Sequence, residues 1–166
     1  MFDSKPNNLQ KISDDPFAYR GYLISVFAEL EQYMDICLAR QFVPDGDFEE
    51  IIAILIDRLN FEAKRTALKA LLDKKCTLDG FKKTKNNKFP HSAILDEIRQ
   101  LSEIRNYFAH YYLCDFFSPG SVIELVEYRN STTVIKYSKK EFEVIIERIV
   151  TVMHFVNDTI GTLKST

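Results

Sequence analysis

The sequence has few of the residues that cross-link a chain or interrupt its regular structure. Its 166 residues include only 5 glycines, 5 prolines and 3 cysteines. The cysteines Cys37, Cys76 and Cys114 are far apart and form no C-x-x-C pair, so their spacing indicates neither a disulfide framework nor a zinc site. We therefore expect reduced thiols in a cytoplasmic protein that uses no metal and no cofactor.

Long apolar runs are also lacking. No stretch approaches the roughly 18–20 apolar residues of a membrane span. The first sixteen residues are polar and include Pro6 and Pro16, which does not fit a secretory signal. The sequence predicts no membrane partner, a flexible N-terminal segment over 1–14 and a single helical domain over 15–166.

The motifs of several common enzyme classes are missing. The sequence contains no H-E-x-x-H zinc motif, no P-loop, no G-x-S-x-G motif and no glycine-rich nucleotide fingerprint. Kinases, dehydrogenases and the hydrolases that carry these motifs are therefore not supported.

An overall excess of positive charge is absent too, because the formal net charge is −2. The whole molecule is therefore not an electrostatic nucleic-acid binder. Charge is unevenly spread, however, and residues 73–88 contain six lysines and two aspartates. Such a basic loop predicts contacts with phosphate, and the alternative is a solvated linker. The candidate phosphate-binding residues are Lys82, Lys83, Lys85 and Lys88.

Hydrophobic periodicity predicts most of the regular structure. Apolar residues three and four apart predict amphipathic helices over 17–42, 47–59, 61–74, 92–113 and 142–160. Two stretches rich in β-branched and aromatic residues, 121–128 and 132–138, flank a short polar turn and predict a hairpin at about 121–138. The expected fold class is mainly α, a helical bundle of about five helices with a β-hairpin inserted before the last helix.

Local signals mark two helix starts and one loop. Asp15 followed by Pro16 is a cap with proline at the first helical position. Ser138 with Glu141 is a capping box. Residues 77–92 include glycine, paired asparagines and proline, and predict a loop.

The predicted fourth helix contains polar residues within an apolar segment. At about 100° per residue, Glu103, Asn106 and His110 cluster opposite the apolar arc, with Arg105 at its margin. We therefore expect an outward-facing polar stripe. The predicted core face comprises Ile94, Ile98, Leu101, Ile104, Phe108 and Tyr112.

Large aromatic residues surround this stripe. Tyr107 is predicted on the outer side, and Tyr111 follows one turn later. An outward face with aromatic side chains is typical of a surface that another chain covers. Tyr107 and Tyr111 are therefore the candidate residues of a homodimer interface.

The string R-N-Y-F-A-H, Arg105 to His110, resembles the R-x(4–6)-H signature of the HEPN superfamily, which prefers a polar residue such as Asn106 after the arginine. The helix order is compatible with that family, including a long first helix with Ala28–Glu31 and a third helix with Lys64-Arg65. The inserted hairpin departs from the simplest HEPN bundle.

The resemblance implies a homodimeric, metal-independent endoribonuclease that acts as a toxin or phage-defence effector. His110 would be its general acid or base, and Arg105 would stabilise the phosphate. Asn106 would hydrogen-bond to His110 or to the phosphate, and Glu103 would orient the imidazole. The RNA supplies the 2′-OH nucleophile, and the expected products carry a 2′,3′-cyclic phosphate and a 5′-hydroxyl. The lysine-rich loop over 82–88 would extend the site for RNA, with Lys82, Lys83, Lys85 and Lys88 as its RNA-binding residues.

Two alternatives stay open at this point. One is a non-catalytic HEPN-like regulator or adaptor, similar to the mannitol-repressor relatives, that dimerises or binds a partner through the same helix face. The other follows from R-x-x-x-x-H-x-Y, which Tyr112 completes and which resembles toxins paired with a nucleotidyltransferase antitoxin that modifies the tyrosine. The remaining histidines, His91 and His154, are expected to be structural or solvated.

Overall fold

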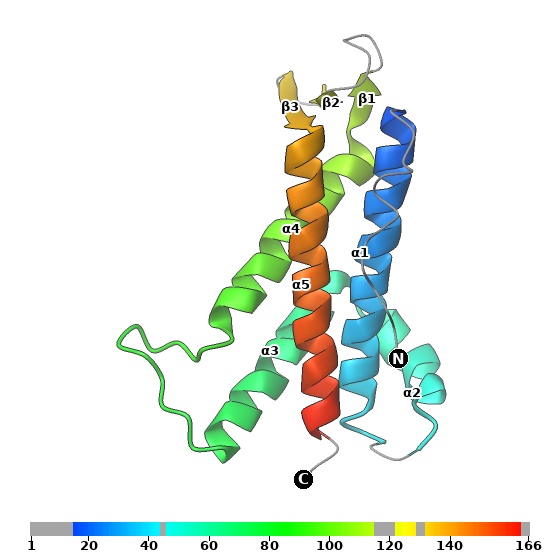
Figure 1. Cartoon of the computed structure of the whole chain (residues 1–166). Coiled ribbons are helices and arrows are strands. Elements are labelled where there is room, and N and C mark those ends of the chain that lie inside the picture. Colours follow the sequence, from blue (N-terminus) through cyan, green and yellow to red (C-terminus); the bar gives the residue numbers. More distant parts are fainter. Residues whose placement is uncertain (1–14, 44–45, 115–121, 129–131, 164–166) are drawn as a thin grey trace.

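The computed structural model describes residues 15–43, 46–114, 122–128 and 132–163 and shows a helical bundle with a small sheet at one end (Figure 1). The helices are α1 (Pro16–Ala39), α2 (Phe48–Ile54), the 3₁₀ turn η2 (Ile56–Arg58), α3 (Phe61–Leu78), α4 (Ser92–His110) and α5 (Lys139–Leu163). The strands are β1 (Tyr112–Cys114), β2 (Val122–Glu127) and β3 (Thr133–Ser138). The predicted mainly α class, with a hairpin before the last helix, is confirmed.

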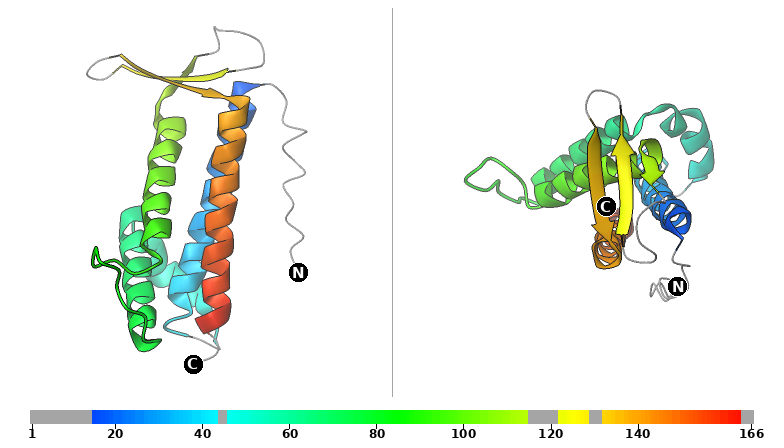
Figure 2. Two further views of the ribbon diagram at one scale, coloured as in Figure 1. Left: turned by 60° about the vertical axis from the view of Figure 1, so that its left-hand side comes forward. Right: turned by 90° about the horizontal axis from the view of Figure 1, so that it is seen from above.

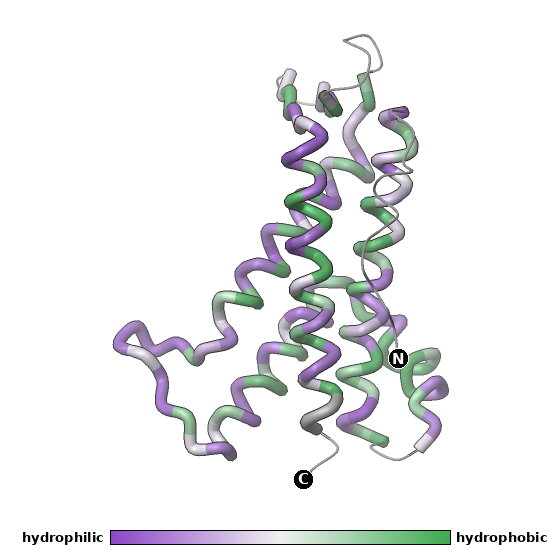
Figure 3. The backbone as a smooth tube through the Cα atoms, in the orientation of Figure 1, coloured by the Kyte–Doolittle hydropathy of each residue, from purple (hydrophilic) through white to green (hydrophobic). Residues whose placement is uncertain are grey.

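The core lies between α1 and α5, which run side by side, with α3 and α4 packed against them (Figure 1). The tube coloured by hydropathy changes between hydrophobic and hydrophilic residues within the turns of these helices (Figure 3), as expected of helices with one buried face. The largest fully buried side chains include Leu23, Leu30, Met34, Leu68, Ile98, Leu101, Phe108, Phe142, Ile146 and Ile149.

The predicted caps are present at the starts of the two longest helices. The Asp15 side chain accepts a hydrogen bond of 2.9 Å from the Phe17 amide, with Pro16 in the first helical position. A carboxylate oxygen of Glu141 accepts a 2.7 Å bond from the Ser138 amide, and the Ser138 hydroxyl accepts a 3.2 Å bond from the Glu141 amide. Side chains therefore satisfy amide groups that the helix itself leaves unpaired.

The sheet has three antiparallel strands in the order β1-β2-β3, and it lies across one end of the bundle (Figure 2). The predicted hairpin is β2 and β3, which pair from Val122 opposite Ser138 to Glu127 opposite Thr133. Its turn, 129–131, lies outside the described residues. The third strand, β1, was not predicted.

Strand β1 corrects the predicted end of the fourth helix, because the helix stops at His110 rather than 113. Tyr111 is extended, with φ −83° and ψ 151°, and Tyr112 pairs with Val126. Tyr112 is 66% exposed, so its predicted place in the core is wrong. Tyr112 lies four residues after Phe108, which is the spacing of one helix face, but its pairing with β2 requires an extended conformation.

Other helix boundaries differ by a few residues. The first helix ends at Ala39 rather than 42, and the third continues to Leu78 rather than 74. The predicted second helix is a short α-helix followed by the turn η2. On α4, Leu95 is buried and Ile94 is only half-buried. The predicted flexible segment, 1–14, lies outside the described residues.

Within the described ranges, no helix has both the length and the apolar character needed to cross a membrane.

Candidate functional site

The outer face of α4 carries one continuous polar stripe. Its side chains are exposed and lie three or four positions apart, so they are neighbours along the helix surface. The stripe consists of Asp96, Arg99, Glu103, Asn106 and His110. The predicted outward direction of Glu103, Asn106 and His110 is confirmed.

Arg105 lies beside this stripe and is half-buried. Its Nη1 donates a hydrogen bond of 3.2 Å to Oδ1 of Asn106, which turns the guanidinium toward the exposed side. No described carboxylate lies within ion-pair distance of this guanidinium, so its charge is available to an anion. Arg105 and Asn106 border an open cleft of about 500 Å³, which is also lined by Phe27, Glu31, Asn60, Phe61, Glu62 and Ser102.

His110 is the last residue of α4 and is exposed. None of the described residues forms a hydrogen bond or ion pair with its imidazole. Five residues at 3.6 per turn place Arg105 and His110 about 140° apart around the helix axis, whereas Asn106 and His110 are only about 40° apart. In a single chain Asn106 and His110 share a face, and Arg105 reaches that face through Asn106.

Glu103 has a different partner from the predicted one. Its carboxylate accepts a 2.6 Å bond from Arg99, and both side chains are about half exposed. This i,i+4 ion pair neutralises part of the stripe next to Asn106. The structure therefore offers no described group that orients the imidazole of His110.

The two aromatic residues assigned to a dimer interface are half-buried and contact the core. The rings of Tyr107 and Tyr111 lie 5.1 Å apart, and the Tyr111 hydroxyl donates a 2.7 Å bond to Glu127 on β2. That bond raises the pKa of Tyr111 above its usual value. The guanidinium of Arg20 on α1 also donates to the Tyr111 carbonyl. These contacts hold the end of α4 to α1 and the sheet.

Tyr112 lies just beyond this junction. Its ring is 5.5 Å from that of Tyr128, and both side chains are more than 60% exposed. A hydroxyl on an exposed ring is accessible to a modifying enzyme, whereas a core tyrosine is not. The predicted core position of Tyr112 would have hidden it from a modifying antitoxin, and the exposed position leaves that alternative open.

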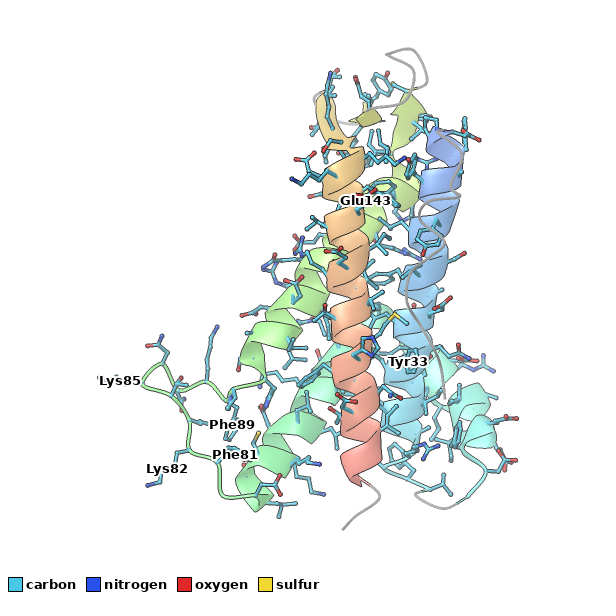
Figure 4. The ribbon with its side chains drawn as sticks, in the orientation of Figure 1. Tyr33, Phe81, Lys82, Lys85, Phe89 and Glu143 are labelled. Carbon is cyan, nitrogen blue, oxygen red and sulfur yellow. The ribbon has the colours of Figure 1, made fainter. Side chains whose placement is uncertain are left out.

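The predicted RNA-binding lysines lie on the exposed loop between α3 and α4, where the sticks of Lys82 and Lys85 extend away from the bundle (Figure 4). Lys83 lies over the ring of Phe89, with Nζ 5.2 Å from the centroid, and Lys88 is 3.4 Å from Asp96. This loop precedes α4, whose 19 residues span about 28 Å. The lysines and His110 therefore lie at opposite ends of one helix and do not form one compact site.

A second cleft, of about 160 Å³, lies beside this loop and includes basic residues that the sequence did not single out for it. Arg65 and Lys69, one turn apart on α3, line it together with Lys83 and Lys88. The spacing of four between Arg65 and Lys69 was the sequence signal that they share one face of the helix. Both are ion-paired, Arg65 with Glu62 at 2.5 Å and Lys69 with Asp73, which reduces the positive charge they add.

His91 was expected to be structural or solvated, and it is buried. His91 is the residue immediately before α4, and its ring lies between Asp73 and Cys76 of α3. His154, on α5, is exposed. Among the described residues, no group of three or more histidine, cysteine, aspartate or glutamate side chains is placed to hold a metal ion.

In comparisons with family models, curated proteins and solved structures, nothing matched this chain. The HEPN resemblance therefore stays a prediction that depends on the motif and the helix order.

Proposed function

We propose that this protein is a metal-independent endoribonuclease of the HEPN type, acting in the cytoplasm as a toxin or phage-defence effector. The observation that supports the proposal best is the polar group at the end of α4, where Asn106 and His110 are exposed and the half-buried Arg105 borders an open cleft. Among the described residues, neither Arg105 nor His110 has an ion-pair partner, and phosphodiester cleavage uses both a cation and an imidazole.

The chemistry follows from these side chains. RNA supplies the nucleophile in its 2′-OH, so cleavage requires a proton acceptor, a proton donor and a cation for the crowded phosphate. One nitrogen of the His110 imidazole can accept a proton and the other can donate one, and general acid–base catalysis by such a group is worth about 10²–10⁴-fold. Arg105 presents a planar fork that matches two phosphate oxygens. Asn106 lies between them and orients either the phosphate or the imidazole.

The divergence of Arg105 and His110 supports a site made from two chains. Because they lie about 140° apart on one helix, a second α4 packed antiparallel across a two-fold axis brings the arginine of one protomer toward the histidine of its partner. The open cleft beside Arg105 then borders the interface. Homodimerisation is thus part of the proposal.

The test is digestion of a mixed RNA substrate with EDTA present. We expect the wild type to cut and His110→Ala to lose at least 10²-fold in rate. His154→Ala is the matched control, because it removes an exposed histidine from a different helix and should keep full activity.

The same experiment distinguishes the nuclease from the non-catalytic regulator. If the wild type and both variants bind RNA or a protein partner but none cuts any RNA, the non-catalytic regulator replaces the nuclease. Equal cutting by His110→Ala and the wild type would contradict the assignment of His110.

A further inference from the structure

Three side chains outside the proposed RNA-cleaving site form a connected set at the end of α4 opposite His110. Nε2 of His91 is 2.6 Å from Oδ1 of Asp73, and Nδ1 of the same ring is 3.4 Å from Sγ of Cys76. Asp73 and Cys76 lie one turn apart on the last part of α3. The loop between the two helices brings His91 back over them.

The hydrogen bonds fix which nitrogen of the neutral His91 ring carries the proton. An ionised carboxylate can only accept, so the ring nitrogen facing Asp73 carries the proton. Burial alone would raise the pKa of Asp73, but hydrogen bonds from Lys69 and His91 outweigh it and lower that pKa, so the carboxylate is ionised. In the neutral ring, the lone pair of Nδ1 then faces the thiol of Cys76. Cysteine hydrolases use this order of thiol, imidazole and orienting group.

The imidazole is also held in place. His91 is only 6% exposed and its ring stacks on Phe89, with centroids 5.7 Å apart and planes 24° apart. In Figure 4, Phe89 and Phe81 lie at the base of the loop, on the side toward the bundle. A ring that is packed and bonded on one nitrogen has little freedom to turn away from the thiol.

The thiol opens onto an apolar pocket of about 310 Å³ at the junction of α3, α4, α5 and the loop. Its apolar lining comes from Leu72, Phe81, Pro90, Ile94 and Phe155, and both Cys76 and His91 border it. Pockets near this volume hold small apolar ligands. Cys76 is partly exposed, whereas Cys37 is fully buried.

Burial, and then the carboxylates of Asp79 and Asp73, raise the pKa of the Cys76 thiol. At neutral pH the sulfur therefore keeps its proton, and attack requires a base in contact with it. His91 is that base. The thiol is thus activated during attack rather than present as a free thiolate.

We propose that Cys76, His91 and Asp73 form a second active site, which takes a small apolar acyl group from an ester or thioester. Sγ of Cys76 attacks the acyl carbonyl carbon, and its proton passes to Nδ1 of His91. The tetrahedral intermediate collapses, the bond to the leaving oxygen or sulfur breaks, and that atom takes the proton from His91. The products are a thioester on Cys76 and a free alcohol or thiol. Asp73 is a positioning residue that holds the ring.

The probe is p-nitrophenyl butyrate, added in excess to the full chain. We expect a burst of one p-nitrophenolate per chain and a butyryl mass on the peptide that contains Cys76. Cys114 is a partly exposed thiol that forms no hydrogen bond with a histidine among the described residues, and it should react at least 10²-fold more slowly. Cys114→Ser should leave the burst unchanged. Equal labelling of Cys76 and Cys114 would overturn the proposal.

Variants of the other two residues test the relay. His91→Gln should slow acylation of Cys76 to the rate of Cys114. Asp73→Asn should slow it about tenfold, and Asp73→Glu should restore part of the loss, which a purely structural role of the carboxylate does not predict. Labelling of the buried Cys37 reports unfolding in the same mass spectrum, so a folded His91→Gln that reacts like the wild type contradicts the base assignment. If His91→Gln unfolds, the comparison of Asp73→Asn with Asp73→Glu tests the relay, and equal rates of acylation in both variants and the wild type would contradict it.

Discussion

Replacing Lys64 by methionine should destabilise the bundle by about 3 kcal/mol at pH 7. Lys64 on α3 is only 4% exposed, and its ammonium donates to Asp35 at 2.8 Å and to Glu31 at 2.9 Å, both on α1. Methionine fills a similar volume but removes the charge. The buried carboxylate of Asp35 then loses its only described hydrogen-bond partner, because Oδ1 already has none.

The magnitude follows from the different surroundings of the two carboxylates. Removing one partner of a buried ion pair costs about 3–5 kcal/mol, since the other charge is left in the interior. The Glu31 side chain is 32% exposed and can turn to water, whereas that of Asp35 is 10% exposed and cannot. The lower end of that range therefore applies, and it corresponds to a fall in Tm of about 6–12 °C for a chain of this size.

The assay is urea unfolding followed by circular dichroism, with an unchanged m-value as the sign of a true change in stability. Lys88→Met is the matched control. Its partner Asp96 is 3.4 Å away and both side chains are more than half exposed, so the loss should stay below about 0.5 kcal/mol. A Lys64→Met protein within 0.5 kcal/mol of the wild type would refute the burial of Asp35. Adding Asp35→Leu should recover most of the loss.

The same variant has a defined pH dependence. Burial raises the pKa of Asp35, and the hydrogen bond and charge of Lys64 pull it down. Without Lys64 this pKa rises further, so the folded variant binds a proton that the unfolded chain has already released. The free energy of unfolding of Lys64→Met should fall as pH rises above the usual aspartate range. The difference in stability between this variant and the wild type should therefore be smaller at pH 5 than at pH 7.

Three further variants test other parts of the structure. Ser138→Ala should lower the free energy of unfolding by about 1 kcal/mol at pH 7. The hydrogen bonds from Ser138 lower the pKa of Glu141, so the wild type loses their contribution as pH falls through this lowered pKa. The difference in stability between the wild type and Ser138→Ala should therefore narrow in acid. Phe108→Ala should cost about 3–5 kcal/mol, whereas Tyr112→Ala should cost under about 1 kcal/mol, and equal losses in urea unfolding would return Tyr112 to the core. Ala109→Glu, an exposed change beside Asn106, should convert the proposed dimer to a monomer in light scattering, because it places like charges across the proposed two-fold axis. Val144→Glu on α5 should leave the dimer intact, and a dimeric Ala109→Glu protein would contradict an interface on this face of α4.

The predicted features that the structure confirms are those that depend on local sequence. The periods of 3.6 and 2 located the helices and the hairpin, and the Ser138 and Asp15 caps needed only neighbours in the chain. The outward direction of Asn106 and His110 followed from helix geometry once α4 was recognised. The predicted helix ends were less accurate, because tertiary packing and not local sequence decides the last turn.

The features that were missed depend on contacts between distant segments. Strand β1 is three residues long, too short for a period, and forms only because β2 pairs with it. The contact of Cys76 with His91 needs the loop to return across 15 residues, and the buried Lys64 needs α1 packed against α3. No local pattern encodes these distances.

The most direct test of the central claim, that the exposed face of α4 cleaves RNA through the 2′-OH, compares two oligonucleotides in EDTA. The first is RNA, in which the cleavage position is mapped, and the second has a single 2′-deoxynucleotide at that position. We predict that the wild type cuts the first, leaves a 2′,3′-cyclic phosphate and does not cut the second there, and that His110→Ala cuts neither. Cleavage at the deoxynucleotide, or no cleavage of the RNA by the wild type, would contradict the claim.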